Sequence, residues 1–102
     1  MRFIVLLTLT AGRPVEDVQA LMQPEVRALW LSYKTGRLRE VYFSTSPPVV
    51  SLFYEAPDLA TVHAELEALP MIEAGLLDRQ VVALGPFVQF EALFDRSVSL
   101  AL

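Results

Sequence analysis

The sequence of 102 residues contains no cysteine, one histidine and only eight basic residues. The absence of cysteine excludes disulfides, thiolate metal sites and a cysteine nucleophile. Twelve acidic residues outweigh the eight basic ones and give a net charge of −4, and no basic stripe that could neutralise phosphates is visible. The same charge balance argues against docking on an anionic membrane. We therefore expect neither nucleic-acid binding nor membrane association.

Long hydrophobic runs are also missing, because no apolar stretch approaches the roughly 18–20 residues that span a bilayer. The N-terminus resembles a signal peptide, but Thr8 and Thr10 interrupt its short apolar part and no clean small-x-small cleavage site follows. We therefore expect a cytoplasmic protein. A glycine-rich phosphate loop, a metal-binding His/Asp spacing and a serine triad are absent from the sequence as well, so we expect no metal and no cofactor.

Apolar residues, in contrast, are abundant for so short a chain. They make up 54% of the sequence, and the mean hydropathy is +0.45, whereas average globular domains contain about 45–50% apolar residues. A chain of this length forms one domain with one small core. The excess of apolar surface therefore suggests that another copy of the chain covers part of it.

The stretch from Phe3 to Leu9 shows no alternation of apolar and polar residues, which predicts a strand that is covered on both faces. We expect one face to pack against helices and the other to face a second sheet, with these members: Phe3, Val5, Leu7 and Leu9 towards the helices, and Ile4, Leu6 and Thr8 towards the second sheet. The reverse assignment stays open, because both faces are apolar.

The remaining elements follow from turn residues and periodicity. A helix begins at Pro14, is interrupted and restarts near Pro24, and stops at Gly36. Its expected apolar stripe consists of Val18, Leu21, Met22, Val26, Leu29 and Tyr33. Strands are expected at 37–44, 49–55 and 80–84, and a short helix at 87–94. The second long helix begins at the N-cap Asp58 and ends at Pro70, with Leu59, Val62, Leu66 and Leu69 on its buried face and Glu65 and Glu67 facing away.

This β-α-β-β-α-β order predicts a ferredoxin-like α+β domain, in which a four-stranded antiparallel sheet carries both helices on one face. The other face of the sheet would then be bare, and leaving Ile4 and Leu6 exposed would forfeit about 1.5–3 kcal/mol each. We therefore expect a symmetric homodimer in which two sheets pack face to face. The domain is expected to span 1–94, with a C-terminal tail at 95–102.

Two parts of the sequence resemble the muconolactone isomerase-like family. The first runs from Pro24-Glu25-Val26-Arg27 to Gly36-Arg37-Leu38-Arg39-Glu40-Val41-Tyr42. The second contains Glu65-Leu66-Glu67-Ala68-Leu69-Pro70-Met71, Ala74-Gly75-Leu76-Leu77-Asp78 and Val81-Val82-Ala83-Leu84-Gly85-Pro86-Phe87. The resemblance implies a dimeric α+β barrel of eight strands from two chains, often assembled into higher oligomers. It also implies an isomerase that shifts a double bond in an unsaturated lactone, although no acid–base pair of that enzyme is matched residue by residue.

Three side chains are candidates for moving a proton, which requires a base, an acid and hydrogen-bond donors to the developing enolate. His63 is the only histidine, and histidine exchanges protons near neutral pH. Glu40 and Glu55 lie on the expected hairpin strands, where burial in the barrel would make either carboxylate a better base. The alternatives are a boundary histidine at the edge of the helix's buried face and two solvated hairpin charges. Strand alternation would place Leu38, Glu40, Tyr42 and Ser44 on one face.

Further polar side chains are candidates for binding a small apolar or carboxylate ligand. Arg37 and Arg39 suit a carboxylate, or else they are solvated or paired with an acid such as Glu40 or Asp78. Tyr42 and Tyr54 could donate to a ligand carbonyl or simply pack, and Thr8 would line the barrel. Trp30 with Tyr33 are expected to be core or interface anchors.

Two functions remain open from the sequence. The first is a cofactor-free isomerase or lyase that acts on a small unsaturated carboxylate or lactone in a mostly apolar pocket. The second is a non-catalytic ligand-binding or assembly dimer.

Overall fold

The computed structural model describes residues 1–94, and their elements follow the predicted β-α-β-β-α-β order with three additional short helical pieces. The bounds are β1 Arg2–Leu9, α1 Val15–Ala20, α2 Met22–Lys34, β2 Leu38–Thr45, β3 Pro48–Glu55, α3 Leu59–Glu67, α4 Pro70–Glu73, β4 Leu77–Leu84 and the 3₁₀ helix η1 Val88–Phe94. The fourth strand begins three residues earlier than the sequence predicts. The predicted tail at 95–102 lies outside the described residues.

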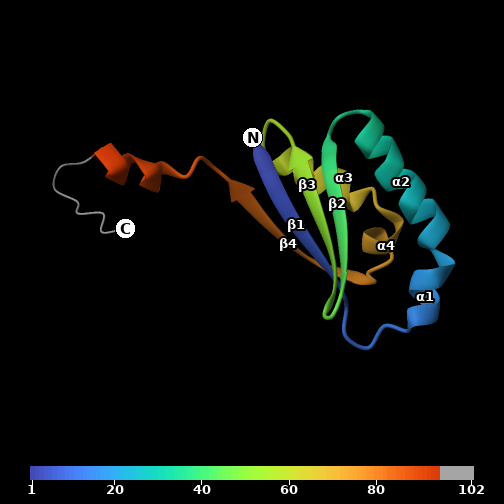
Figure 1. Cartoon of the computed structure of the whole chain (residues 1–102). Coiled ribbons are helices and arrows are strands. Elements are labelled where there is room, and N and C mark those ends of the chain that lie inside the picture. The colour runs from blue at the N-terminus through green and yellow to red at the C-terminus, as the bar shows by residue number, and fades with distance from the viewer. Residues whose placement is uncertain (95–102) are drawn as a thin grey trace.

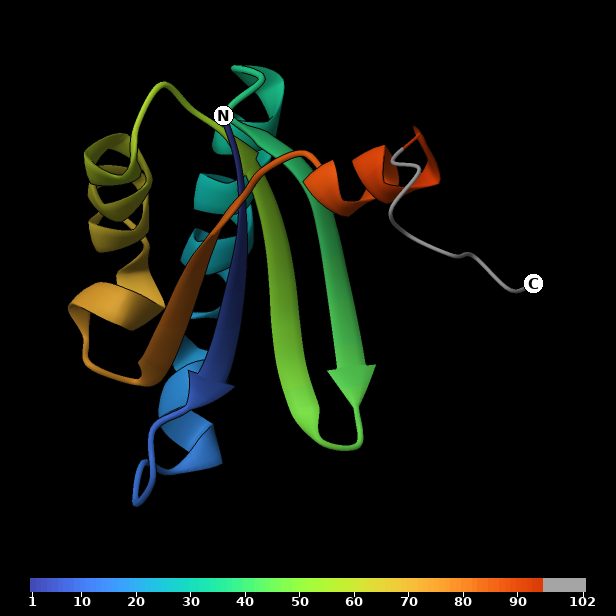
Figure 2. The ribbon, with the colours of Figure 1, turned by 90° about the vertical axis from the view of Figure 1, so that its left-hand side faces the viewer.

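The sheet has the strand order β2-β3-β1-β4, and all neighbouring strands are antiparallel. Helices α1 to α4 cover one face of the sheet (Figure 1), and the opposite face, here called the open face, is turned to the viewer in Figure 2. The ferredoxin-like α+β fold is therefore confirmed. Strand β1 lies between β3 and β4, so its backbone is paired along both edges, while its apolar residues Ile4 and Leu6 lie on the open face.

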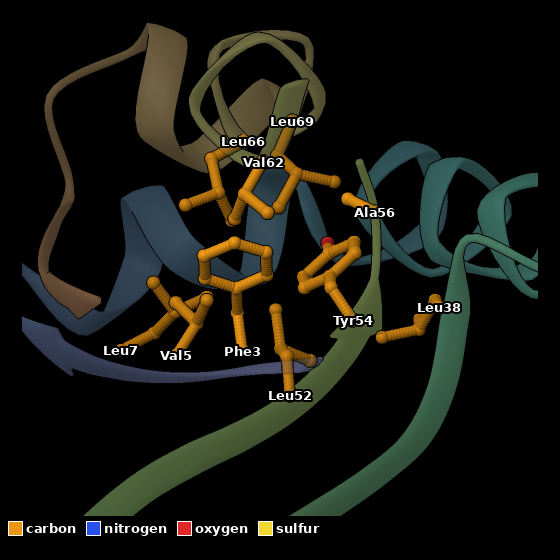
Figure 3. Packing of buried hydrophobic residues seen from close by; sticks show 10 residues of the cluster. All are labelled: Phe3, Val5, Leu7, Leu38, Leu52, Tyr54, Ala56, Val62, Leu66 and Leu69. Carbon is orange, nitrogen blue, oxygen red and sulfur yellow. The ribbon is translucent and has the colours of Figure 1, made fainter. Parts of the chain in front are cut away.

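The core lies between the sheet and the helices. Phe3, Val5 and Leu7 of β1 are buried, as predicted, and Leu9 at the end of the strand is exposed, contrary to the prediction. Figure 3 shows these side chains packed against α3 residues. The complete cluster comprises Phe3, Val5, Leu7, Leu38, Leu52, Tyr54, Ala56, Val62, Leu66 and Leu69.

The predicted apolar stripe of the first long helix is wrong for α2. The buried residues of this helix are Glu25 and Ser32, with Ala28 and Leu29 packed partly against the core, whereas Met22, Val26 and Tyr33 are exposed. The prediction placed the interruption near Pro24 and carried one apolar stripe across it. The break lies instead at Leu21, which has φ −103° and ψ 3° between α1 and α2, and it changes the direction in which the side chains of α2 point.

A β-bulge changes the predicted face of Leu38. In the register of β2 and β3, Leu38 pairs with Tyr54 and Glu40 pairs with Phe53, so Arg39 is an extra residue. An extra residue reverses the alternation of side chains. Leu38 is therefore buried under the helices, while Glu40 follows Phe53 to the open face.

The other predicted helix ends are confirmed, but Pro70 begins α4 and does not end α3, which stops at Glu67. Asp58 caps α3 by accepting a hydrogen bond from the Thr61 N–H at 2.8 Å. Pro24 lies in the first turn of the restarted helix α2, and Gly36 follows that helix with φ +84°, a conformation that favours glycine. Local chemistry therefore determines where these helices begin and end.

Candidate functional site

One hollow lies on the helix-covered side of the sheet, and a second adjoins it at the end of the sheet, where β2 begins and β3 ends; the two share Thr35 and Glu65. The inner hollow has a volume of about 290 Å³ and is lined by Ala28, Leu31, Ser32, Thr35, Tyr54, Glu65, Ala68 and Leu69. The outer hollow has a volume of about 530 Å³ and is lined by Thr35, Gly36, Arg37, Arg39, Glu55 and Glu65. The inner hollow lies between α2, α3 and β3, and its lining is mostly apolar. The outer hollow is mostly polar.

The Tyr54 hydroxyl is the most unusual group in the inner hollow. The side chain is fully buried, and its oxygen has no hydrogen-bond partner among the described residues. In Figure 3 the ring lies beside Phe3, with the oxygen directed away from β3 towards the helices. Leaving a buried hydroxyl without a partner costs about 1–3 kcal/mol, so this group is a candidate for a functional role.

Burial raises the pKa of Tyr54 far above its usual value, and the negative charges of Glu65 and Glu25 raise it further. The phenol therefore stays protonated at all physiological pH values. A protonated phenol is a hydrogen-bond donor, and no described residue accepts from this one.

Glu65 supplies the carboxylate at the junction of the two hollows. Its Oε2 accepts a hydrogen bond from the Ser32 hydroxyl at 3.1 Å, and its Oε1 lies 3.7 Å from Nε of Arg37. These contacts orient the carboxylate between α2 and the start of β2. The prediction that Glu65 and Glu67 both face away from the buried side is wrong for Glu65 and correct for the exposed Glu67.

Glu25 is a second carboxylate, buried where α2 meets α4. Its Oε1 accepts a hydrogen bond from the Met71 N–H at 2.9 Å. Desolvation raises the pKa of Glu25, and the Met71 hydrogen bond opposes the rise. The residue ties two helices together beside the inner hollow.

The sequence candidates separate into groups. Strand register places Thr8, Glu40 and Tyr42 on the open face, where the Tyr42 hydroxyl donates to Glu40 at 2.8 Å. This hydrogen bond and the Glu40 charge raise the pKa of Tyr42. Glu55, at the end of β3, lies 3.6 Å from Nε of Arg2 and also lines the outer hollow.

The other candidates lie on the helix-covered side. Arg37 and Arg39 both line the outer hollow, as expected for residues that grip a carboxylate. Arg37 pairs with Glu65, and Arg39 donates to the carbonyl oxygen of Gly36 at 2.8 Å; neither pairs with Glu40 or Asp78 within the described residues. Of the candidates named from the sequence, only Tyr54 lines the inner hollow. His63 is half-buried on α3 and lines neither hollow.

Sequence reasoning missed the polar residues that accompany Tyr54, namely Glu25, Ser32 and Glu65. A signal was present, because Glu25 and Ser32 are seven positions apart and therefore share one face of a helix. Glu65 similarly lies between the buried Val62 and Leu66. Burying a polar side chain at a core position of a helix costs free energy, so such residues are candidates for a functional role.

Residues 1–94 contain no group of three or more His, Asp or Glu side chains arranged to hold a metal ion. Nor does this part of the chain include a helix that is both long and apolar enough to cross a membrane.

Neither a protein-family model nor a curated protein sequence matches the chain. Among solved structures, the chain is similar to 5-chloro-2-hydroxyhydroquinone dehydrochlorinase (TftG) from Burkholderia phenoliruptrix AC1100 in complex with 2,5-dihydroxybenzoquinone, with a TM-score of 0.69 and 16% identity. The two proteins share a fold. The match covers 83% of this chain and 94% of the dehydrochlorinase. One fold can host many reactions, so at this identity the likeness shows the α+β fold alone.

Proposed function

We propose that the protein is a cofactor-free isomerase or lyase of the muconolactone isomerase-like kind, which moves a proton in a small unsaturated carboxylate or lactone. The observation that carries this proposal is the buried Tyr54 hydroxyl, which has no partner among the described residues and lines a mostly apolar hollow beside the Glu65 carboxylate. A carboxylate can serve as the base, and a tyrosine as the donor to the enolate, that this reaction class requires.

The proposed chemistry assigns one role to each of three side chains. Glu65 accepts a proton from a carbon next to the substrate carbonyl, and the electron pair of the broken C–H bond enters the enolate. Tyr54 donates a hydrogen bond to the enolate oxygen. Return of the proton to another carbon shifts the double bond, whereas departure of a leaving group makes the reaction an elimination. Arg37 at the outer hollow binds the substrate carboxylate.

The structural neighbour supports the size and kind of ligand. The dehydrochlorinase was solved with 2,5-dihydroxybenzoquinone, a single oxygenated ring. The inner hollow of about 290 Å³ lies just below the usual range of ligand-pocket volumes, about 300 to 1,000 Å³. A one-ring substrate is therefore a better match than a larger molecule.

The proposal is tested by binding and by turnover. Binding of 2,5-dihydroxybenzoquinone is measured by titration calorimetry, and isomerisation of muconolactone in D₂O is followed by NMR through deuterium incorporation. Tyr54→Phe and Glu65→Gln are each expected to lower turnover by about 10²-fold or more. Glu67→Gln, on the exposed side of the same helix, is the matched control. A wild-type protein that neither binds the quinone nor exchanges deuterium would refute the proposal.

The alternative is a non-catalytic assembly or ligand-binding homodimer, and the open face favours it. Ile4, Leu6 and Phe53 lie on this face without helices above them, and Val82 is exposed there. In this alternative Glu40→Gln, Glu55→Gln and His63→Ala leave cellular function intact, whereas a charged residue on the open face abolishes it. Loss of function in any one of these three polar variants, with the dimer intact, would contradict the alternative.

A further inference from the structure

The C-terminal segment 85–94, here called the arm, does not pack on its own domain. Its apolar side chains are between 56% and 86% exposed: Phe87, Val88, Phe90, Leu93 and Phe94. Phe87 and Phe90 contact each other edge to face at 5.0 Å between ring centroids. Because the arm projects, the radius of gyration is 17.5 Å, whereas a compact chain of this length has about 13 Å.

A second unexplained apolar surface lies on the outside of α2. It consists of Met22, Val26, Trp30 and Tyr33, here called the α2 stripe, and these side chains are between 48% and 58% exposed. Their spacing of four, four and three residues places them along one side of the helix. Trp30 and Tyr33 stack with ring centroids 5.7 Å apart. Exposed aromatic residues in a row are typical of protein interfaces.

Charge distinguishes the possible partners of the arm. Glu91 is the only charged residue between Gly85 and Phe94. The exposed charges of α2 are both positive, Arg27 and Lys34, and neither is paired within residues 1–94. The open face instead carries three acids, Glu40, Glu55 and Asp78, of which Glu55 is paired with Arg2 and with the N-terminus. Glu91 is therefore attracted to Arg27 and Lys34 beside the α2 stripe, whereas Glu40 and Asp78 on the open face repel it.

The arm cannot reach the α2 stripe of its own chain. In Figure 1 the arm leaves β4 on the side of the sheet opposite the helices, and in Figure 2 it crosses in front of one end of the sheet while α2 lies behind. We propose that the arm of one copy docks on the α2 stripe of a second copy, with its phenylalanines on Trp30 and Tyr33 and Glu91 near Arg27 and Lys34. Each chain carries both the arm and the α2 stripe, so identical subunits can exchange their arms.

Trp30 is the only tryptophan, so its fluorescence reports directly on the stripe. The experiment measures the emission maximum and acrylamide quenching of the full chain and of Phe90→Asp, with sedimentation and circular dichroism as checks of assembly and folding. Phe43→Asp is the matched control, because Phe43 is an equally exposed aromatic residue on edge strand β2. We expect Trp30 to be protected in the wild type and in Phe43→Asp, and to become quenchable with red-shifted emission in Phe90→Asp.

Equal quenching of Trp30 in the wild type and in Phe90→Asp would overturn the proposal. If Trp30 is accessible in both proteins, nothing covers the α2 stripe; if it is shielded in both, another contact covers it, such as the α2 stripe of a second copy. Equal loss of protection in Phe43→Asp would overturn it as well. The charges provide an independent test: Glu91→Lys should weaken association, and Arg27→Glu with Lys34→Glu in the same chain should restore it. Failure of the reversed charges to restore association would contradict the assigned pairing.

Discussion

Replacing Glu25 by glutamine or by leucine tests how its buried carboxylate and its hydrogen bond each affect the stability of the fold. Glu25 is 4% exposed, and its Oε1 accepts from the Met71 N–H at 2.9 Å. Glutamine keeps a carbonyl oxygen for this hydrogen bond and removes the charge, whereas leucine removes both. Comparison of the two variants therefore separates the hydrogen bond from the charge.

The charge contributes a pH dependence whose sign follows from the raised pKa of Glu25, which is caused by desolvation. The folded state holds the proton more tightly than the unfolded state. The stability from this group is fully present below the unfolded value of 4.5 and is lost as the pH rises through the folded pKa. Glu25→Gln should therefore gain stability relative to the wild type as the pH rises above 4.5, up to a plateau.

The loss of the hydrogen bond to Met71 determines how strongly Glu25→Leu is destabilised. Without an acceptor, the buried Met71 N–H is left unsatisfied, at a cost of about 1–3 kcal/mol. In a domain of this size that loss lowers the Tm by roughly 5–20 °C. The assay is thermal unfolding by circular dichroism between pH 4 and 8 at one fixed protein concentration, because association shifts the Tm. Glu16→Gln, at an exposed carboxylate, controls for the change in net charge.

Two results would refute this reasoning. One is a stability difference between Glu25→Gln and the wild type that does not change with pH. The other is a leucine variant that melts at the same temperature as the glutamine variant, because the Met71 N–H would then not depend on this acceptor.

Three further predictions concern the core, the site and the assembly. Leu52→Ala, at a fully buried position of the sheet, should lower the free energy of unfolding by about 2–5 kcal/mol in a urea titration. Leu59→Ala, at an exposed position, should change this free energy little. Equal effects of the two substitutions would contradict the assigned core. Tyr54→Phe should leave the stability unchanged or raise it, because it removes a hydroxyl without a partner among the described residues. The same variant should weaken binding of 2,5-dihydroxybenzoquinone. A large loss of stability would show that the hydroxyl is satisfied within the protein. Leu6→Lys on the open face should convert the expected homodimer to monomers in sedimentation, whereas Val15→Lys should not; an unchanged sedimentation profile would place the interface elsewhere.

The sequence by itself determined the parts of the fold that depend on local chemistry. Asp58 marks the start of a helix through its own side chain, and Gly36 marks the end of one through its positive φ. The unbroken apolar run from Phe3 predicts a strand, and β1 is a central strand of the sheet. These signals lie within a few residues of the structures they specify.

Only the tertiary structure decided which side chains meet. The bulge at Arg39 moves Leu38 to the helix-covered side, and no residue pattern within β2 predicts it, because a bulge depends on the partner strand. The phase of α2 similarly depends on the break at Leu21, which directs Glu25 and Ser32 inwards. Tyr54 and Glu65 come from elements separated in sequence, and packing of α2 and α3 on the sheet brings them to one hollow. The candidate site is therefore a product of long-range contacts.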